Sequence, residues 1–283
     1  MSCPSYLVIG HVSMDLAADY QIGGSFTYAA MTARNLGERV GGITSAGPDV
    51  DLAETLPGVD VIHMPSTITT TFQITYAGKR RRLLLRAVAS NIGPEQVPEA
   101  WRAADIVHLA PIAQEVSPAI VSCFPRSFVG VTPQGWMRRW NDAGRISKAP
   151  WRDAEDILRR AQAVVLSQED VLGGKRAIRR LADLAQVLVV TRGAAGADLY
   201  LQGKVCHFPA FAAREVDPTG AGDTFAAAFF VKLRHTGDPF QATHFANCVA
   251  SFVVEAVGPR GVPTLEQIDE RLKTQPAPTE PAS

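Results

Sequence analysis

Residues 217–225 combine residue types that could handle a phosphate group. They read Asp-Pro-Thr-Gly-Ala-Gly-Asp-Thr-Phe and lead directly into an apolar run at 225–231. Gly220 and Gly222 let the backbone turn its N–H groups outward with no Cβ in the way, and a helix start adds a partial positive charge. The stretch therefore predicts a seat for phosphate at a helix N-terminus.

Asp223 is the unusual member of this stretch, because a carboxylate beside an anion site would normally repel the anion. Its presence makes sense if it accepts a proton while a phosphoryl group passes. The alternative is that Asp217 or Asp223 only caps a helix after a Gly/Pro turn. Capping accounts for one Asp and one Gly but not for the whole string, so we favour the phosphoryl-transfer interpretation.

The elements that must position this loop follow an alternating order. Short apolar runs predict strands at 6–9, 40–46, 59–64, 106–109, 128–131, 163–166 and 187–191. Helical patterns predict helices at 25–36, 117–123, 152–161 and 175–185. This order is typical of an α/β fold with a mainly parallel central sheet covered by helices on both faces.

The chain changes character after residue 191. Two short strands at 197–201 and 205–208 lead to the phosphate-seat stretch, and three helices follow at 223–234, 239–257 and 265–273. Residues 274–283 are rich in Pro, Thr, Ala and Glu without periodicity, so we expect a disordered tail. Residues 1–273 are then expected to form one domain.

Residues 69–88 break the α/β rhythm. The segment 69–76 is β-branched and alternating, 77–79 predicts a turn, and 80–88 returns as a second strand. The basic run at 79–82 is interpreted as a solvated hairpin tip in preference to a phosphate contact.

Charge and cysteine content limit the class of protein. The 283 residues carry 28 Lys and Arg against 28 Asp and Glu, so no global field recruits nucleic acid or an anionic membrane. A small-molecule partner in a cleft is favoured. The four cysteines are scattered without a C-x-x-C pair, which argues against a zinc site or a disulfide framework. With no membrane-spanning stretch and no signal peptide, we expect a soluble, cytoplasmic protein.

The stretch 217–225 resembles the C-terminal signature of the ribokinase-like (phosphofructokinase-B type) carbohydrate kinases. The resemblance extends from 8–16 to 258–263 and so covers nearly the whole chain. It implies a ribokinase-like fold with a small β-sheet lid over the sugar site, built from strands within 11–20 and 69–88. It also implies ATP and Mg²⁺ as cofactors, and it allows a monovalent cation as a third. The implied acceptor is a sugar or cyclitol, and the implied assembly is a monomer or homodimer.

The sequence has no G-x-x-x-x-G-K-[ST] motif, so phosphate handling falls to the loop that runs from Thr219 to Asp223. Asp223 would accept the proton of a substrate hydroxyl as its oxygen attacks the γ-phosphate of ATP. The N–H groups of Gly220, Ala221 and Gly222 would stabilise charge on the transferring phosphoryl group. No covalent phosphoenzyme is needed.

Asp15 follows the first predicted strand, at the carboxyl edge where ligands of open α/β sheets gather. Its carboxylate could accept hydrogen bonds from two neighbouring hydroxyls, and the resembled family places a substrate-binding Asp here. The alternative is a turn Asp that caps the next segment. The family's glycine pair near the substrate corresponds to Gly23 and Gly24. Where many members then carry Asn, this chain has Tyr28, preceded by Thr27, which suggests a different ring or rim chemistry from ribose, and we assign both residues to the acceptor.

The nucleotide side rests on three weaker patterns. The T-x-G-x-x-G pattern of Thr191, Arg192, Gly193 and Gly196 borders the nucleotide in the resembled family. Asn247 and the loop beginning at Gly258 match its adenine-side wall, although helix packing and a helix C-cap explain them equally well.

The metal side departs from the family pattern. The family commonly has N-x-x-E where this chain has Ser167, Glu169 and Asp170, so a carboxylate is retained one methylene shorter. Water-mediated Mg²⁺ binding tolerates that change, and we assign Asp170 and Glu169 to the metal and Ser167 to the nucleotide. The alternative is a helix start with acidic residues favoured by its dipole.

Several segments are most similar to the myo-inositol kinase branch: 23–28, 167–170 and 131–138. Gln134 and Arg138 follow a core strand and could reach the substrate or nucleotide, or serve only as loop residues. Two other functions stay open. One is a kinase of ribose, a fructose derivative or a nucleoside on the same fold, and the other is a non-catalytic sugar or nucleotide sensor.

Overall fold

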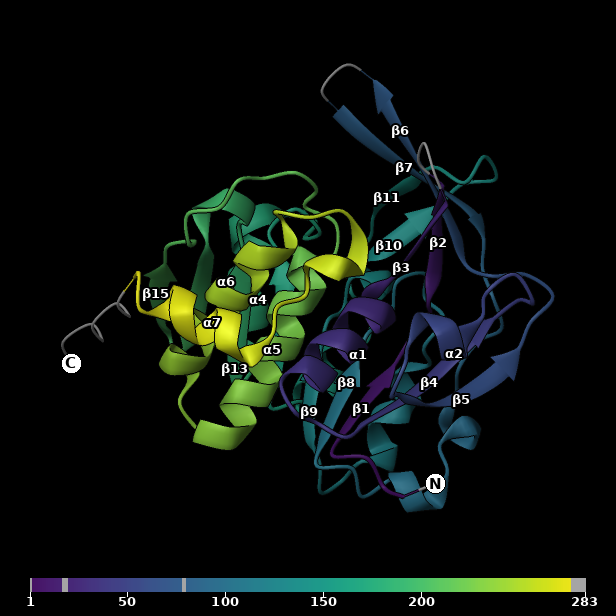
Figure 1. The fold of residues 1–283 in the computed structure, drawn as a ribbon, viewed down its shortest axis with the longest axis horizontal. Helices are drawn as coiled ribbons and strands as arrows, with labels where there is room; N and C mark the ends of the chain where they lie inside the picture. The colour runs from purple at the N-terminus through teal and green to yellow at the C-terminus, as the bar shows by residue number, and fades with distance from the viewer. Residues whose placement is uncertain (1, 17–19, 78–79, 276–283) are drawn as a thin grey trace.

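The computed structural model describes residues 2–16, 20–77 and 80–275, and its centre is a nine-stranded sheet (Figure 1). The strand order is β15-β14-β13-β12-β9-β8-β1-β4-β5, and the seven strands from β13 to β5 are parallel. Their bounds are β1 Tyr6–Ile9, β4 Val40–Ala46, β5 Asp60–Pro65, β8 Ile106–Leu109, β9 Phe128–Val131, β12 Ala163–Ser167 and β13 Val187–Thr191. The antiparallel edge is β14 Ala197–Leu201 and β15 Lys204–Phe208.

The parallel sheet is buried on both faces, which is why its strands are continuous apolar runs. In β1, Tyr6 and Val8 pack into one hydrophobic cluster and Leu7 and Ile9 into the other. The predicted α/β class with a mainly parallel sheet is therefore confirmed.

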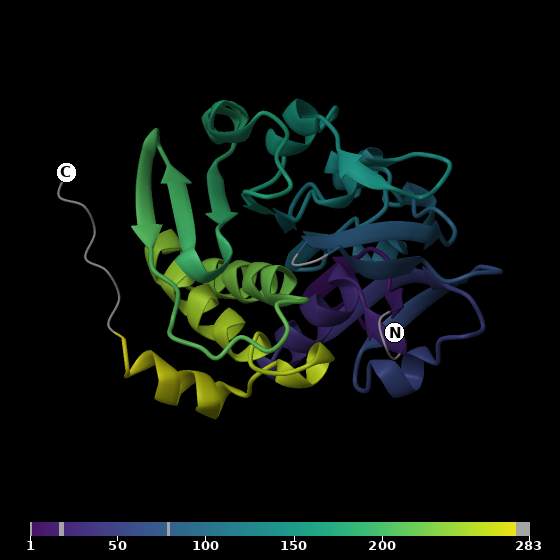
Figure 2. The same ribbon diagram turned by 90° about the horizontal axis from the view of Figure 1, so that it is seen from above.

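Helices cover the two faces as two separate layers, which lie on opposite sides of the sheet in Figure 2. One layer holds α1 Ser25–Asn35, α5 Ala221–Thr236, α6 Pro239–Val253 and α7 Leu265–Leu272. The other holds α3 Ala154–Leu158 and α4 Gly174–Leu184. A short helix α2, Leu52–Thr55, follows β4.

A second, four-stranded sheet forms the lid, in the order β3-β2-β6-β7. Its strands are β2 Ser13–Leu16, β3 Tyr20–Gly23, β6 Thr71–Ala77 and β7 Arg80–Ala87. The predicted hairpin and the predicted contribution of 11–20 are confirmed, while β3 was not predicted. Residues 78–79, and with them part of the basic run 79–82, lie outside the described residues, as do 276–283 of the predicted tail.

Three helix predictions need correction. Residues 118–123 form a 3₁₀ helix, and the helix expected over 152–161 shortens to α3. The helix expected to reach residue 257 ends at Val253, because the Val254 carbonyl accepts hydrogen bonds from the N–H groups of Val216 and Asp217 at 2.7 and 3.2 Å. A tertiary contact with the phosphate-seat stretch therefore ends that helix.

A hairpin that the sequence patterns did not predict joins β9 to α3. It consists of β10 Arg138–Trp140 and β11 Ile146–Lys148, paired antiparallel. Its strands are three residues long, too short for periodicity to show.

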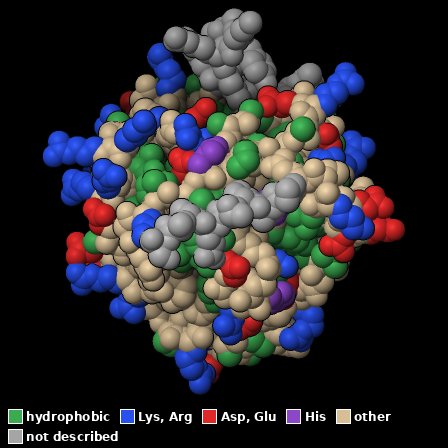
Figure 3. Space-filling view, turned by 90° about the vertical axis from the view of Figure 1, so that its left-hand side faces the viewer, with side chains coloured by type: hydrophobic (Ala, Val, Ile, Leu, Met, Phe, Trp, Pro, Cys, Tyr) green, Lys and Arg blue, Asp and Glu red, His purple; other side chains and the backbone are tan. Residues whose placement is uncertain are grey.

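On the face shown in Figure 3, Lys and Arg side chains are interspersed with Asp and Glu. This mixture agrees with the formal net charge of zero. Within the described ranges, no helix is both long and apolar enough to cross a membrane.

Candidate active site

The phosphate-seat loop begins helix α5 with Gly220 in the left-handed conformation, at φ 80°. Asp217 shapes the turn, since its Oδ1 accepts the N–H of Thr219 at 3.0 Å, and no side chain caps the helix. Neither Asp217 nor Asp223 therefore caps α5, which was the alternative interpretation of these two residues. Capping explains neither carboxylate.

Three backbone N–H groups at this helix start are available to an anion. Among the described residues, the N–H groups of Gly220, Gly222 and Asp223 have no hydrogen-bond acceptor. The Ala221 N–H differs from expectation, because it donates to Pro218 O at 3.3 Å. The geometry still presents a cradle of donors at the positive end of α5.

Asp223 sits half-buried in the first turn of α5. Loss of water around its carboxyl group raises the pKa of Asp223 to about 6. A hydrogen bond from Ser25 and the charge of Arg138 act in the opposite direction, while Asp170 and Asp15 add to the rise. These interactions bring side chains from five separate segments into one site.

Ser25 was missed by the sequence reasoning. It is the first residue of α1 and is buried, so its hydroxyl reaches Asp223 from the facing helix start. The available signal was a hydroxyl residue directly after the pair Gly23 and Gly24.

Asp15 lies on lid strand β2, with its carboxylate across Gly23. Ser13 Oγ donates to Asp15 Oδ1 at 3.1 Å, and a Cβ added to Gly23 would lie 2.7 Å from Asp15 Oδ2. Gly24 is equally constrained, because it has φ 89° and its added Cβ would lie 2.7 Å from His11 O. The glycine pair thus makes room for the carboxylate and for the chain beside it.

Thr27 and Tyr28 are not on the site surface, contrary to the expectation that they contact the acceptor. Thr27 is fully buried and its hydroxyl donates to Gly23 O at 2.7 Å. Tyr28 is 2% exposed, and its ring packs against Gly220. Both residues therefore pack inside the protein, against Gly23 and Gly220, and do not line the site.

Gln134 and Asp170 meet at the carboxyl edge of the sheet. Gln134 Nε2 donates to Asp170 Oδ2 at 3.1 Å. Burial raises the pKa of Asp170, while Arg138, the Gln134 hydrogen bond and Lys148 lower it and Glu169 adds to the rise. The Asp170 carboxylate is thus held by neutral and cationic partners.

Arg138 connects this edge to the lid. Its Nη1 donates to Ile112 O at 3.0 Å, and its guanidinium lies 5.6 Å from the ring centroid of Phe72 on β6. Its positive charge also lowers the pKa of Asp223 and the pKa of Asp170. Arg138 is therefore the cation at the centre of the site.

The residues fit Mg²⁺ that arrives with a phosphate ligand. No cluster of three or more His, Cys, Asp or Glu side chains suited to a metal occurs in the part of the chain that the structure describes. Mg²⁺ is usually held by one or two carboxylates together with substrate phosphates, and half-buried Asp170 supplies one. Glu169 is exposed, and its N–H donates to Ser167 Oγ at 3.1 Å.

The expected nucleotide-side residues have structural work in this fold. Asn247 is buried, and its amide donates to Phe208 O and Pro209 O at 3.2 and 3.3 Å. Gly196 has φ 91°, and an added Cβ would overlap Phe208 O. For Asn247, the packing interpretation is the one that these contacts support.

Other members of this set lie at the strand ends. Thr191 pairs in register with Ser167, so the two expected nucleotide residues stand side by side. Arg192 forms an ion pair with Asp198 at 3.2 Å, and Gly193 has φ 56°. Gly258 starts a 3₁₀ helix that runs to Gly261.

Comparisons with known proteins show what this chain is similar to. The model of the pfkB family carbohydrate kinases matches residues 152–265. Fructokinase from Escherichia coli is 33% identical over 153 residues, which cover 48% of this chain and 48% of that protein. The chain thus spans about half the length of this curated relative.

Solved structures match over almost the whole chain. A pyrophosphate-dependent kinase in the ribokinase family, complexed with a pyrophosphate analog and myo-inositol, gives a TM-score of 0.77 at 22% identity, covering 95% of this chain and 99% of that one. A protein from E. coli described as a putative ribokinase II, in complex with ATP and Mg²⁺, gives a TM-score of 0.73 at 20% identity, covering 97% of this chain and 100% of that one. At these identities the likeness shows the fold. Residues 152–265 are thus similar to the pfkB family carbohydrate kinases, and the chain as a whole has the fold of the solved ribokinase-family structures.

Proposed function

We propose that residues 1–273 act as one ATP- and Mg²⁺-dependent kinase domain that phosphorylates a hydroxyl of a sugar or cyclic polyol, with myo-inositol as the acceptor. The observation that carries the proposal is the position of Asp223. A carboxylate of raised pKa stands beside N–H groups that have no acceptor among the described residues. A base beside an anion-binding site is an arrangement that phosphoryl transfer to a hydroxyl uses.

Asp223 acts as the general base. With a pKa of about 6 it is ionised at neutral pH, yet it is more basic than an ordinary Asp. It takes the proton of the acceptor hydroxyl as that oxygen attacks the γ-phosphorus and the bond to ADP breaks. The N–H groups of Gly220 and Gly222, with the α5 dipole, stabilise the charge on the transferred group.

Asp15 holds the acceptor. Ser13 donates to its carboxylate and Gly23 leaves room for it, and an ionised carboxylate is an acceptor suited to two adjacent hydroxyls. Closure of the lid sheet over the acceptor would exclude water from the reaction. When bound, Mg²⁺ neutralises charge on the donor phosphates, and Asp170 is the carboxylate that would hold it.

Two observations support myo-inositol. The Asp15 carboxylate suits adjacent hydroxyls, which a cyclitol carries all around its ring. In addition, one structure of the same fold was solved with myo-inositol. Tyr28 gives no support to this choice of acceptor, because it is buried and its ring packs against Gly220. All four cysteines are free, which supports a reducing compartment, and we propose the cytoplasm.

An acceptor panel tests the proposal. With ATP and Mg²⁺, myo-inositol should give a higher kcat/KM than ribose, fructose, fructose 6-phosphate or adenosine, measured by ADP release. Faster turnover of another acceptor would overturn myo-inositol and leave the kinase. Absence of turnover with every acceptor, with ATP or with pyrophosphate as donor, would favour the non-catalytic sensor.

A further inference from the structure

A cavity of about 900 Å³ opens beside Asp170, between lid strand β7 and the β10–β11 hairpin. Four cationic side chains line it: Arg86, Arg138, Arg145 and Lys148. Among the described residues that line it, Asp170 is the one carboxylate. Such an excess of positive charge in a concave site favours an anionic ligand.

Two of these cations stand directly opposite each other. Arg138 on β10 pairs in register with Lys148 on β11, and like charges at such a position destabilise a sheet. Both line the same cavity as Asp170, and the positive charge of each lowers the pKa of its carboxyl group. An anion bound between the two strands would reduce this repulsion.

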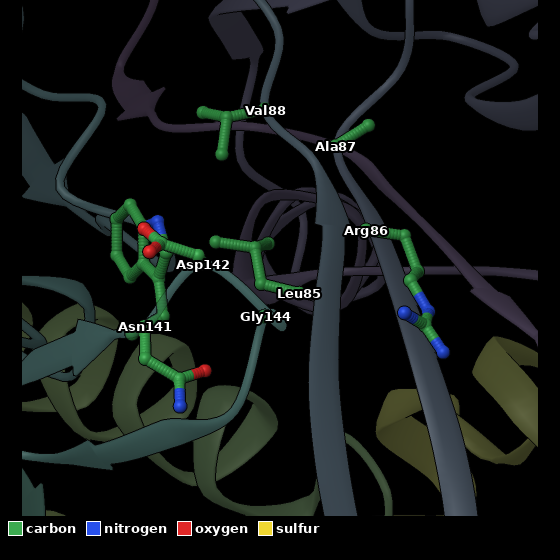
Figure 4. Close-up of a pocket in the computed structure, with 8 residues that line it drawn as sticks. Leu85, Arg86, Ala87, Val88, Asn141, Asp142 and Gly144 are labelled. Atoms are coloured by element: carbon green, nitrogen blue, oxygen red, sulfur yellow. The ribbon is translucent and has the colours of Figure 1, made fainter.

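The hairpin is fixed to the lid by its own backbone. Leu85 N–H donates to Gly144 O at 2.8 Å, and Leu84 forms a bridge with Arg145. Gly144 has φ 74°, and an added Cβ would overlap Leu85 O, so only glycine allows this approach. Figure 4 shows the residues of the hairpin turn beside Leu85. Arg145 is therefore held at a set position relative to β7.

We propose that the β10–β11 hairpin binds the polyphosphate of the donor, with Lys148 and Arg145 contacting its non-transferred phosphates. Guanidinium and ammonium groups match phosphate oxygens in charge and hydrogen bonding. Asp170 in the same cavity would repel a bare phosphate but suits a phosphate chain that carries Mg²⁺. A phosphorylated acceptor would need the cations alone, so the mixed lining favours the donor.

The inference rests on the proposed function, and its first test needs no turnover. The variant Lys148→Gln/Arg145→Gln is titrated calorimetrically with inorganic tripolyphosphate and Mg²⁺ in the absence of acceptor. Two lost charge-assisted contacts should weaken binding by about tenfold or more. The control Arg139→Gln removes one positive charge from the other face of β10, where Arg139 Nε donates to Ser147 Oγ, and should bind like wild type. Equal tripolyphosphate binding by the double variant and wild type overturns the proposal.

Steady-state kinetics distinguish donor from acceptor. The double variant should raise KM for ATP by about tenfold and leave KM for the acceptor within about twofold. A raised acceptor KM with an unchanged donor KM would mean that the anion belongs to the acceptor, which contradicts the proposal. If no acceptor is phosphorylated at all, the kinase function fails, while the calorimetric result still decides the hairpin site.

Misfolding is excluded as a cause by melting each variant. Lys148 and Arg145 are exposed, so their substitution should leave the melting temperature near that of wild type. The charge reversal Lys148→Glu should weaken tripolyphosphate binding more than Lys148→Gln. The opposite order would also overturn the proposal.

Discussion

The ring of Tyr28 packs against Gly220 so closely that a Cβ on Gly220 would overlap it. Tyr28 lies on α1, and Gly220 starts α5, the helix that carries Asp223. Because Gly220 also has φ 80°, this position excludes any side chain twice, by backbone strain and by overlap. The phosphate seat therefore depends on the fit between two helix starts.

Gly220→Ala should damage both fold and activity. The left-handed conformation alone costs an Ala about 1–2 kcal/mol, and displacement of the Tyr28 ring adds to it. We expect a lower melting temperature and a kcat/KM reduced by about 10²-fold or more. Gly222→Ala is the matched control for stability, because an added Cβ there meets nothing within 4 Å. Equal melting temperatures of Gly220→Ala and wild type would contradict this account.

Asp223→Asn should bind ATP but lose catalysis. The amide cannot accept the hydroxyl proton, so kcat should fall by about 10² to 10⁴, the usual range for a lost general base. ATP binding by calorimetry is the control, since the N–H groups of the seat remain. A purified variant with nearly wild-type kcat would remove Asp223 from the proposed role.

The pH dependence of kcat/KM should report the same group. Because its pKa is raised to about 6, Asp223 becomes protonated as the pH falls through that value. Below pH 6, kcat/KM should decline by about tenfold per pH unit. A profile that stays flat down to pH 5 would show that a different group, or no titrating group, controls the reaction.

The same shift has a consequence for stability. The pKa of Asp223 is higher in the folded state than the ordinary 3.8, so above pH 6 its charge penalises the folded state. Asp223→Asn lacks this penalty and should melt at a higher temperature than wild type at pH 8. The difference should shrink as the pH falls from 6 to 4, because the carboxyl group becomes neutral in the folded state.

Substitutions at the metal side should change the Mg²⁺ requirement. Asp170 is half-buried and held by Gln134, whereas Glu169 is exposed. Asp170→Ala should therefore raise the Mg²⁺ concentration for half-maximal rate more than Glu169→Ala does. Identical Mg²⁺ titrations for wild type and both variants would leave these residues with only structural roles.

Asp15→Ala should loosen the acceptor. Loss of the carboxylate removes contacts that orient the attacking hydroxyl, so kcat/KM for the acceptor should fall sharply while KM for ATP changes less. Ser13→Ala, which removes one hydrogen bond to Asp15, should give a smaller effect in the same direction. A larger change in the KM for ATP than in that for the acceptor would place Asp15 on the donor side.

Much of the fold could be predicted because it is recorded locally. The runs that became β1, β8, β9 and β12 are apolar and buried on both faces, which a linear pattern reveals. The loop around Gly220 and Asp223 could also be predicted, since left-handed glycines and a helix start depend on neighbouring residues. The short hairpin β10–β11 could not be predicted in this way, because a tertiary contact between Gly144 and β7 holds it in place.

The sequence by itself determined the α/β architecture, the lid hairpin and the glycine turn that begins α5, because periodicity and turn chemistry are local properties. The tertiary structure alone decided that Ser25 reaches Asp223, that Tyr28 supports Gly220 from below, and that Asn247 braces the backbone of Phe208. These pairs come from distant segments, so burial and packing set their roles and no local pattern records them.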